Sequence, residues 1–198
     1  GRWPWELSAG WDGPLDDTYP TLAELLARNG YATAGFSGNL LNVTHVSGLD
    51  RGFVRWEDYT PSAGELALSA SILRTLAYST PVRRLVGWHE LLNRRHAPDV
   101  GDGFLSWLAE RPSGRPWFAF VNLYDAHEPH FPADSLVNFR GWNDFTHHGG
   151  ISLGGNAWVT AKWELPAGRV ALHRSAYRGA VGAADRETGR LLEELERR

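Results

Sequence analysis

The stretch Trp117-Phe118-Ala119-Phe120-Val121-Asn122-Leu123-Tyr124 decides the fold that the sequence predicts. It is a nearly unbroken apolar run, and turn-forming residues at positions 112–116 precede it. Such a run predicts a β-strand that is buried on both faces, as in a parallel sheet. The run leads directly into Asp125, so polar residues follow at the carboxyl end of the predicted strand.

A helix and a second strand are predicted near the start of the chain. Thr21 and Glu24 have the spacing of a capping box, in which each side chain accepts a hydrogen bond from the backbone N–H of the other residue. Gly30 is expected to end this helix, because glycine adopts the left-handed conformation at little cost. Residues 31–36 follow as a short strand, which gives half of an α/β unit.

The rest of the chain completes a predicted α/β architecture. Residues 37–59 are expected to form a loop. Further helices are expected over residues 64–96, with a break near Thr80-Pro81, and over residues 104–110 and 172–198. The last helix is expected to bury one side, formed by Tyr177, Val181, Ala184, Thr188, Leu191, Leu192 and Leu195. We therefore predict a single α/β domain over residues 1–198, with helices covering a mixed or mostly parallel sheet.

The composition narrows the class of protein. The 198 residues suffice for one domain with a sizeable core, and the net charge of −3 gives no sign of a nucleic-acid-binding surface. No apolar run approaches the ~20 residues of a membrane span. The chain has no Cys, which excludes disulfides and Cys nucleophiles within these residues and favours a reducing compartment such as the cytoplasm. We expect neither nucleic acid nor a membrane as a partner.

The best candidate site is the segment Asp125-Ala126-His127-Glu128-Pro129-His130, directly after the apolar run. In open α/β sheets, ligands bind beyond the carboxyl ends of the strands. An imidazole at this position can donate a proton to a leaving oxygen near neutral pH, and His127 is the candidate for that role. The alternative is a loop of solvated polar residues, which the spacing alone leaves open.

Several stretches share the order and spacing of a known family. The first covers residues 21–36, the second is Gly48-Leu49-Asp50-Arg51-Gly52-Phe53, and the third covers residues 116–129. A fourth, within the last helix, covers residues 177–192. Together they resemble the sulfatase family of the alkaline phosphatase superfamily. The resemblance implies an incomplete α/β/α sandwich of the alkaline phosphatase-like type.

The resemblance also implies an activity. Sulfatases hydrolyse the sulfate esters of small molecules or saccharides, using a formylglycine made from Cys or Ser beside a divalent cation, usually Ca²⁺. By this resemblance His127 would contact the sulfate or protonate the leaving group. Asn39 and His130 would be substrate-binding neighbours in the same pocket.

The sequence departs from the family pattern at both ends. The resemblance implies a central section, because the family's N-terminal metal-binding Asp pair, its Cys/Ser-x-Pro-x-Arg nucleophile motif and its C-terminal metal pair have no counterpart at the expected places. We therefore expect no metal ligands in this chain and no activity from it alone. The Ser79-Thr80-Pro81-Val82-Arg83 stretch fits the bare nucleophile pattern, but it follows the first α/β unit, and a helix break explains it as well.

Other readings remain open. The parent enzyme could be a phosphate or phosphonate ester hydrolase, or a phosphotransferase, of the same superfamily. The chain could also be a catalytically inactive binding module. His147-His148 is expected to be a surface loop, and Asp16-Asp17 is expected to lie in the loop that leads into the first helix.

Overall fold

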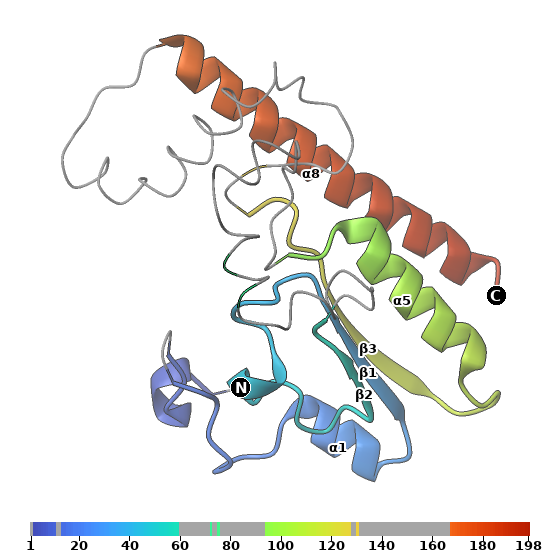
Figure 1. Cartoon of the computed structure of the whole chain (residues 1–198). Helices are drawn as coiled ribbons and strands as arrows, with labels where there is room; N and C mark the ends of the chain where they lie inside the picture. The colour runs from blue at the N-terminus through green and yellow to red at the C-terminus, as the bar shows by residue number, and fades with distance from the viewer. Residues whose placement is uncertain are drawn as a thin grey trace. The chain divides into compact units, whose positions relative to one another are not determined.

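The computed structural model describes residues 2–10, 13–59, 72, 75, 94–127, 130 and 167–198. These residues belong to two compact units. The first unit comprises Gly1–Tyr59, Asn93–Tyr124 and Glu187–Arg198, and the second comprises Thr60–Leu92 and Asp125–Arg186. The two units are not placed relative to one another, so each has its own description (Figure 1).

A parallel sheet forms the centre of the first unit. Strand β1 (Ala32–Ser37) lies between β2 (Arg55–Glu57) and β3 (Trp117–Asn122), in the order β2-β1-β3 (Figure 1). The register of β1 with β3 runs from Ala32 opposite Trp117 to Ser37 opposite Asn122. Every residue of β1 is buried, because this strand has a neighbour on each side. The predicted parallel pairing and α/β class are confirmed.

Helix α1 (Leu22–Arg28) begins at the predicted capping box. The hydroxyl of Thr21 accepts a hydrogen bond from the N–H of Glu24 at 3.1 Å, and a carboxylate oxygen of Glu24 accepts one from the N–H of Thr21 at 2.7 Å. Gly30, with a φ of 87°, turns the chain from the helix into β1. Two short 3₁₀ helices, η1 (Pro4–Leu7) and η2 (His45–Ser47), lie before and after this α/β unit.

One face of the sheet is covered by α5 (Ala97–Glu110), which contacts β1 and β3. The helix begins seven residues earlier than predicted, and the proline in its first turn is well suited to a helix start. Phe36 is completely buried here and packs edge-on against Phe104, with ring centroids 5.9 Å apart. The last part of α8 (Ala167–Glu196) adds Leu191 and Leu195 to this core.

Three sequence-based predictions about the elements are wrong. β3 is not buried on both faces: Phe120 is 37 % exposed, because among the described residues only β1 pairs with β3 and no helix covers its second face. The expected loop over residues 37–59 contains β2, whose short length gives little periodicity. In α8, Tyr177, Val181 and Leu192 are exposed, and buried side chains are instead those of Ala176, Ala180, Glu187 and Leu191.

Two predicted features lie outside the described residues. These are the Ser79–Arg83 stretch, with most of the helix expected around it, and the His147-His148 pair. In the described part of the chain, no helix combines the length and the apolarity that a membrane crossing requires.

Candidate functional site

The carboxyl ends of β1 and β3 meet at one edge of the sheet. β1 ends at Ser37 and β3 at Asn122, and the N–H of the next residue, Gly38, donates to the carbonyl of Asn122 at 2.8 Å. A Cβ at Gly38 would lie 2.8 Å from that carbonyl oxygen and 3.1 Å from the backbone nitrogen of Tyr124. A glycine is therefore required for the chain to leave both strands this close together.

Asn39 lies at this edge with its side chain held in one orientation. The residue is 7 % exposed, and its N–H donates to the hydroxyl of Ser37 at 3.1 Å. Its side-chain oxygen accepts hydrogen bonds from the N–H groups of Leu41 and Asn42, at 3.1 and 3.0 Å. Because both of these partners are donors, the atom facing them must be the oxygen. The amide nitrogen is then the group that Asn39 can offer to an acceptor.

The structure adds Arg94 to this edge. Arg94 and Asn39 form an antiparallel β-bridge, and the N–H of Arg95 donates to the carbonyl of Gly38 at 3.0 Å. The guanidinium carbon of Arg94 lies 5.1 Å from the centre of the Tyr124 ring, and the residue is only 7 % exposed. No sequence signal pointed to Arg94, because a basic residue just before a helix is ordinary at a surface.

The neighbouring Arg95 has a different environment. Its guanidinium donates to a carboxylate oxygen of Glu57 at 3.5 Å and to the carbonyl of Asp99 at 3.0 Å. Glu57 is also paired with Arg55, at 2.6 Å. Both Arg95 and Glu57 are buried, so the pair neutralises two charges that would be costly to bury alone. Arg95 is therefore committed to joining β2 to α5.

The predicted residues of the Asp125–His130 segment belong to the second unit. Asp125 is fully buried, whereas His127 is exposed. The ring of His130 packs against that of Tyr177, with centroids 5.1 Å apart and an interplanar angle of 62°. The structure therefore brings together Asn39, Asn122, Arg94 and Tyr124 in the first unit, whereas His127 and His130 belong to the second.

The described residues do not fit the cofactors that the resemblance implies. Among them, no group of three or more His, Asp or Glu side chains could hold a metal ion. The chain has no Cys from which a formylglycine could be made, and Ser79, in the stretch that fits the bare nucleophile pattern, lies outside the described residues. No chemical step is therefore assigned to either cofactor on these residues.

Two acidic residues in the first unit have lowered pKa values for structural reasons. The pKa of Asp16 is lowered mainly by a hydrogen bond from the N–H of Thr18, at 3.0 Å, which holds the loop leading into α1 as predicted. Burial alone would raise the pKa of Asp58, but hydrogen bonds from the backbone and ring of His45, at 2.7 and 3.0 Å, outweigh it. Asp16 does not follow a strand, whereas Asp58 directly follows the carboxyl end of β2, where its carboxylate is bonded to His45.

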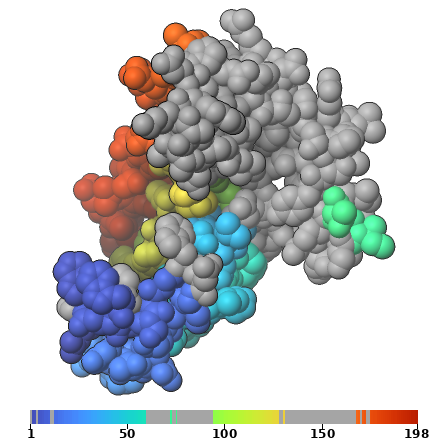
Figure 2. All heavy atoms as spheres, turned by 90° about the vertical axis from the view of Figure 1, so that its left-hand side faces the viewer, coloured from blue at the N-terminus to red at the C-terminus, as the bar shows by residue number. Residues whose placement is uncertain are grey.

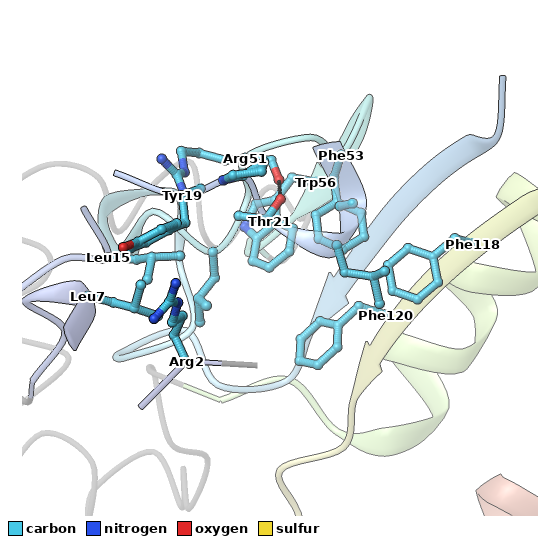
Figure 3. A pocket seen from close by; sticks show the side chains of 14 residues that line it. Arg2, Leu7, Leu15, Tyr19, Thr21, Arg51, Phe53, Trp56, Phe118 and Phe120 are labelled. Atoms are coloured by element: carbon cyan, nitrogen blue, oxygen red, sulfur yellow. Dashed lines mark hydrogen bonds between the residues drawn. The ribbon is translucent and has the colours of Figure 1, made fainter. Parts of the chain in front are cut away.

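A cavity of about 340 Å³ opens on the second face of the sheet (Figure 3). Its walls come from the N-terminal segment, the start of α1, the segment before β2 and the middle of β3. The residues that line it are mostly apolar, and the labelled ones are Arg2, Leu7, Leu15, Tyr19, Thr21, Arg51, Phe53, Trp56, Phe118 and Phe120. Figure 2 shows the N-terminal segment and α1, in blue, side by side on the surface of this unit. None of the lining residues follows the carboxyl end of β1 or β3, so the cavity is separate from the edge with Asn39 and Arg94.

Comparison with known proteins identifies the family. The family model described as Sulfatase matches residues 5–198. Neither a search of curated proteins nor a search of solved structures finds a match. The matched range covers almost the whole chain and contains all the stretches on which the sequence resemblance rests. The chain belongs to the sulfatase family.

Proposed function

We propose that this chain is the central part of a single catalytic domain that hydrolyses a sulfate ester. Membership of the sulfatase family is the observation that carries the proposal. The parallel sheet supports it, because ligands of open α/β sheets bind beyond the carboxyl ends of the strands, where Asn39 and Asn122 lie. The proposed substrate is the sulfate ester of a small molecule or a saccharide.

In this proposal His127 is the general acid. It follows β3 by a few residues and its side chain is exposed, so a substrate can reach the ring. Hydrolysis breaks the ester link between sulfur and the leaving oxygen, and a protonated imidazole can supply the proton that this oxygen needs to leave as a hydroxyl. Asn39 would donate its amide N–H to a sulfate oxygen, and His130 would be a further substrate neighbour.

The family's cofactors would need residues other than those described. A divalent cation, Ca²⁺ by the family resemblance, neutralises charge on a transferring oxyanion when it is bound, and formylglycine is the family's nucleophile. We expect the 198-residue chain alone to be inactive for this reason. The contribution of the chain itself would be to orient the ester and to move one proton.

The test is hydrolysis of 4-nitrophenyl sulfate by the protein encoded by the complete gene, with Ca²⁺ and with a chelator. His127→Ala should lower kcat by at least about 100-fold, because general acid catalysis contributes about 10²–10⁴. His45→Ala is the matched control, since its exposed imidazole is bonded to Asp58 in a loop. The control should retain nearly all activity.

Two results would overturn this assignment in different ways. A loss below about tenfold in His127→Ala would remove His127 from the acid role. Turnover of 4-nitrophenyl phosphate in place of the sulfate would support the alternative, a phosphate ester hydrolase or phosphotransferase of the same superfamily. No turnover of either ester would support an inactive binding module.

A further inference from the structure

We infer that Arg94 and Asn39 form a binding site for the tetrahedral oxyanion of the substrate, with Tyr124 as its floor. This inference rests on the proposed function, because it assigns a positively charged side chain, that of Arg94, to substrate binding at the same edge of the sheet. Nothing in the sequence pattern or in the family match names Arg94. The inference depends on residues of the first unit alone.

The backbone places the two side chains together. Asn39 and Arg94 are directly opposite each other in an antiparallel bridge. Opposite residues in such a pair have Cβ atoms about 4.5–5.5 Å apart and project to the same side. The N–H of Arg95, which donates to the carbonyl of Gly38, fixes this alignment from the next position. The side chains of Asn39 and Arg94 therefore leave the backbone on the same side, at the place where β1 ends.

The donors available at this place suit an oxyanion. The oxygen of the Asn39 side chain is held by the N–H groups of Leu41 and Asn42, so its nitrogen is the remaining polar group and a donor. A guanidinium has five N–H donors in a fixed plane, and the Nε of Arg94 is buried with no hydrogen-bond partner among the described residues. Its planar fork matches the oxygens of phosphate-like groups. Two side chains with N–H donors, one of them charged, thus come from directly opposite residues of the same bridge.

The ring of Tyr124 holds the guanidinium of Arg94 in place. The guanidinium of Arg94 lies over the face of this ring, 5.1 Å from its centre, in the arrangement of a cation–π contact. A cation–π contact uses the face of the guanidinium, whereas its N–H groups point outward in its plane. Tyr124 is itself fixed close to Gly38, where the two strands end. The ring therefore holds the charge at the carboxyl edge of the sheet.

Other arginines of the first unit are used differently. Arg95 is paired with buried Glu57. Arg115 donates to the carbonyls of Gly30 and Tyr31, before the start of β1 at the opposite edge of the sheet. Arg51 is near Glu24 and lines the separate cavity. In the described part of the first unit, Arg94 is thus the arginine that is bridged to the residue just after β1 and that also lies over the ring of Tyr124.

The experiment is a titration of the ¹⁵N-labelled 198-residue chain with sodium sulfate, at an ionic strength held constant with sodium chloride. Backbone amide shifts of Gly38, Asn39 and Arg94 report binding. We expect a saturable change in the wild-type chain. Arg94→Met should weaken sulfate binding at least about tenfold, because a hydrogen bond to a charged group contributes about 1.5–3 kcal/mol, and 1.4 kcal/mol is tenfold in affinity.

A second variant keeps the test valid if Arg94→Met unfolds. Asn39→Asp retains an oxygen for the N–H groups of Leu41 and Asn42, but it removes the donor and adds a negative charge. It should fold and lose sulfate binding at least about tenfold. Asn42→Asp adds the same charge on the exposed side of the same turn, and Arg115→Gln removes a cation at the other edge. Both controls should change the affinity less than about twofold.

The inference is overturned if the wild-type chain shows no saturable shift at these amides, if Arg94→Met binds sulfate like the wild type, or if Arg115→Gln loses binding equally. The same titration with sodium phosphate separates this inference from the proposed function. Site-specific binding of phosphate in preference to sulfate would support the oxyanion site and count against a sulfate ester. Sulfatase activity that survives Arg94→Met would overturn the site and leave the function intact.

Discussion

The two faces of the sheet are built from alternate residues of the same strands, and they differ in how they are covered. On the first face, Ala32, Ala34 and Phe36 of β1 pack against α5. On the second face, Phe118 and Phe120 of β3 lie beside a cavity of about 340 Å³. Phe36 of β1 is therefore fully buried, whereas Phe120 of the neighbouring strand β3 is 37 % exposed.

The size of the side chains explains this difference. Alanines on the first face let α5 approach β1 closely, so that Phe36 is completely enclosed by helix side chains. On the second face, aromatic rings contact one another beside the start of α1: Trp56 stacks on Phe120, with centroids 6.2 Å apart. Phe120 stays 37 % exposed. The lesson is that one face of the sheet is a closed core and the other is a partly open aromatic layer.

The largest expected effect tests this contrast directly. Phe36→Ala should destabilise the chain by about 3–5 kcal/mol, because it removes a fully enclosed ring and leaves a cavity. Phe120→Ala should cost less than half as much, since water already reaches its ring. The measurement is equilibrium urea unfolding followed by Trp fluorescence. Equal losses in the two variants would show that the second face is as closed as the first.

The next effect concerns a wall of the cavity. Gly52 has a φ of 87°, and a Cβ there would lie 2.1 Å from the backbone nitrogen of Glu24 in α1. Gly52→Ala should cost at least about 2 kcal/mol, from the left-handed conformation and the backbone clash together. Gly30→Ala is the matched control, with the same φ but no atom within 4 Å of the added carbon. It should cost about 1–2 kcal/mol, and thermal melting of both variants sharpens the comparison.

If Gly30→Ala and Gly52→Ala melt at the same temperature, the close contact between the loop before β2 and α1 is not a structural constraint. The cavity wall would then be free to move. A clear difference, with Gly52→Ala less stable, would assign that wall to a fixed part of the first unit.

The smallest effect depends on pH. The pKa of Glu24 is lowered from its ordinary value of 4.5, first by the hydrogen bond from the N–H of Thr21, against a smaller effect of burial, and then by the Arg51 charge. A lowered folded-state pKa means that the carboxylate contributes stability above pH 4.5, and that this contribution is lost as the pH falls through the folded value. Glu24→Gln should therefore cost about 0.3–1 kcal/mol at pH 7, and less at pH 3.5.

Urea unfolding at the two pH values measures this difference. Glu196→Gln, at the exposed end of α8, is the control and should change little at either pH. A constant cost of Glu24→Gln at both pH values would mean that the charge of Glu24 does not support the start of α1 beside the cavity.

The amino-acid sequence by itself determined the local elements and the family. The capping box of α1 depends on residues three positions apart, and the strand β3 depends on one continuous apolar run, so both were predictable. The order and spacing of the family stretches were also predictable, and the match over residues 5–198 confirms them. These signals are carried by neighbours along the chain.

Only the tertiary structure decided which side chains share the edge of the sheet. Three interactions join segments that are far apart in sequence. They are the bridge between Asn39 and Arg94, the pairing of β2 with β1, and the ion pair between Glu57 and Arg95. The same holds for the second face of β3, whose exposure depends on what covers it rather than on its own apolar residues. Such pairings depend on which segments meet when the chain folds, and no local pattern of residues encodes that choice.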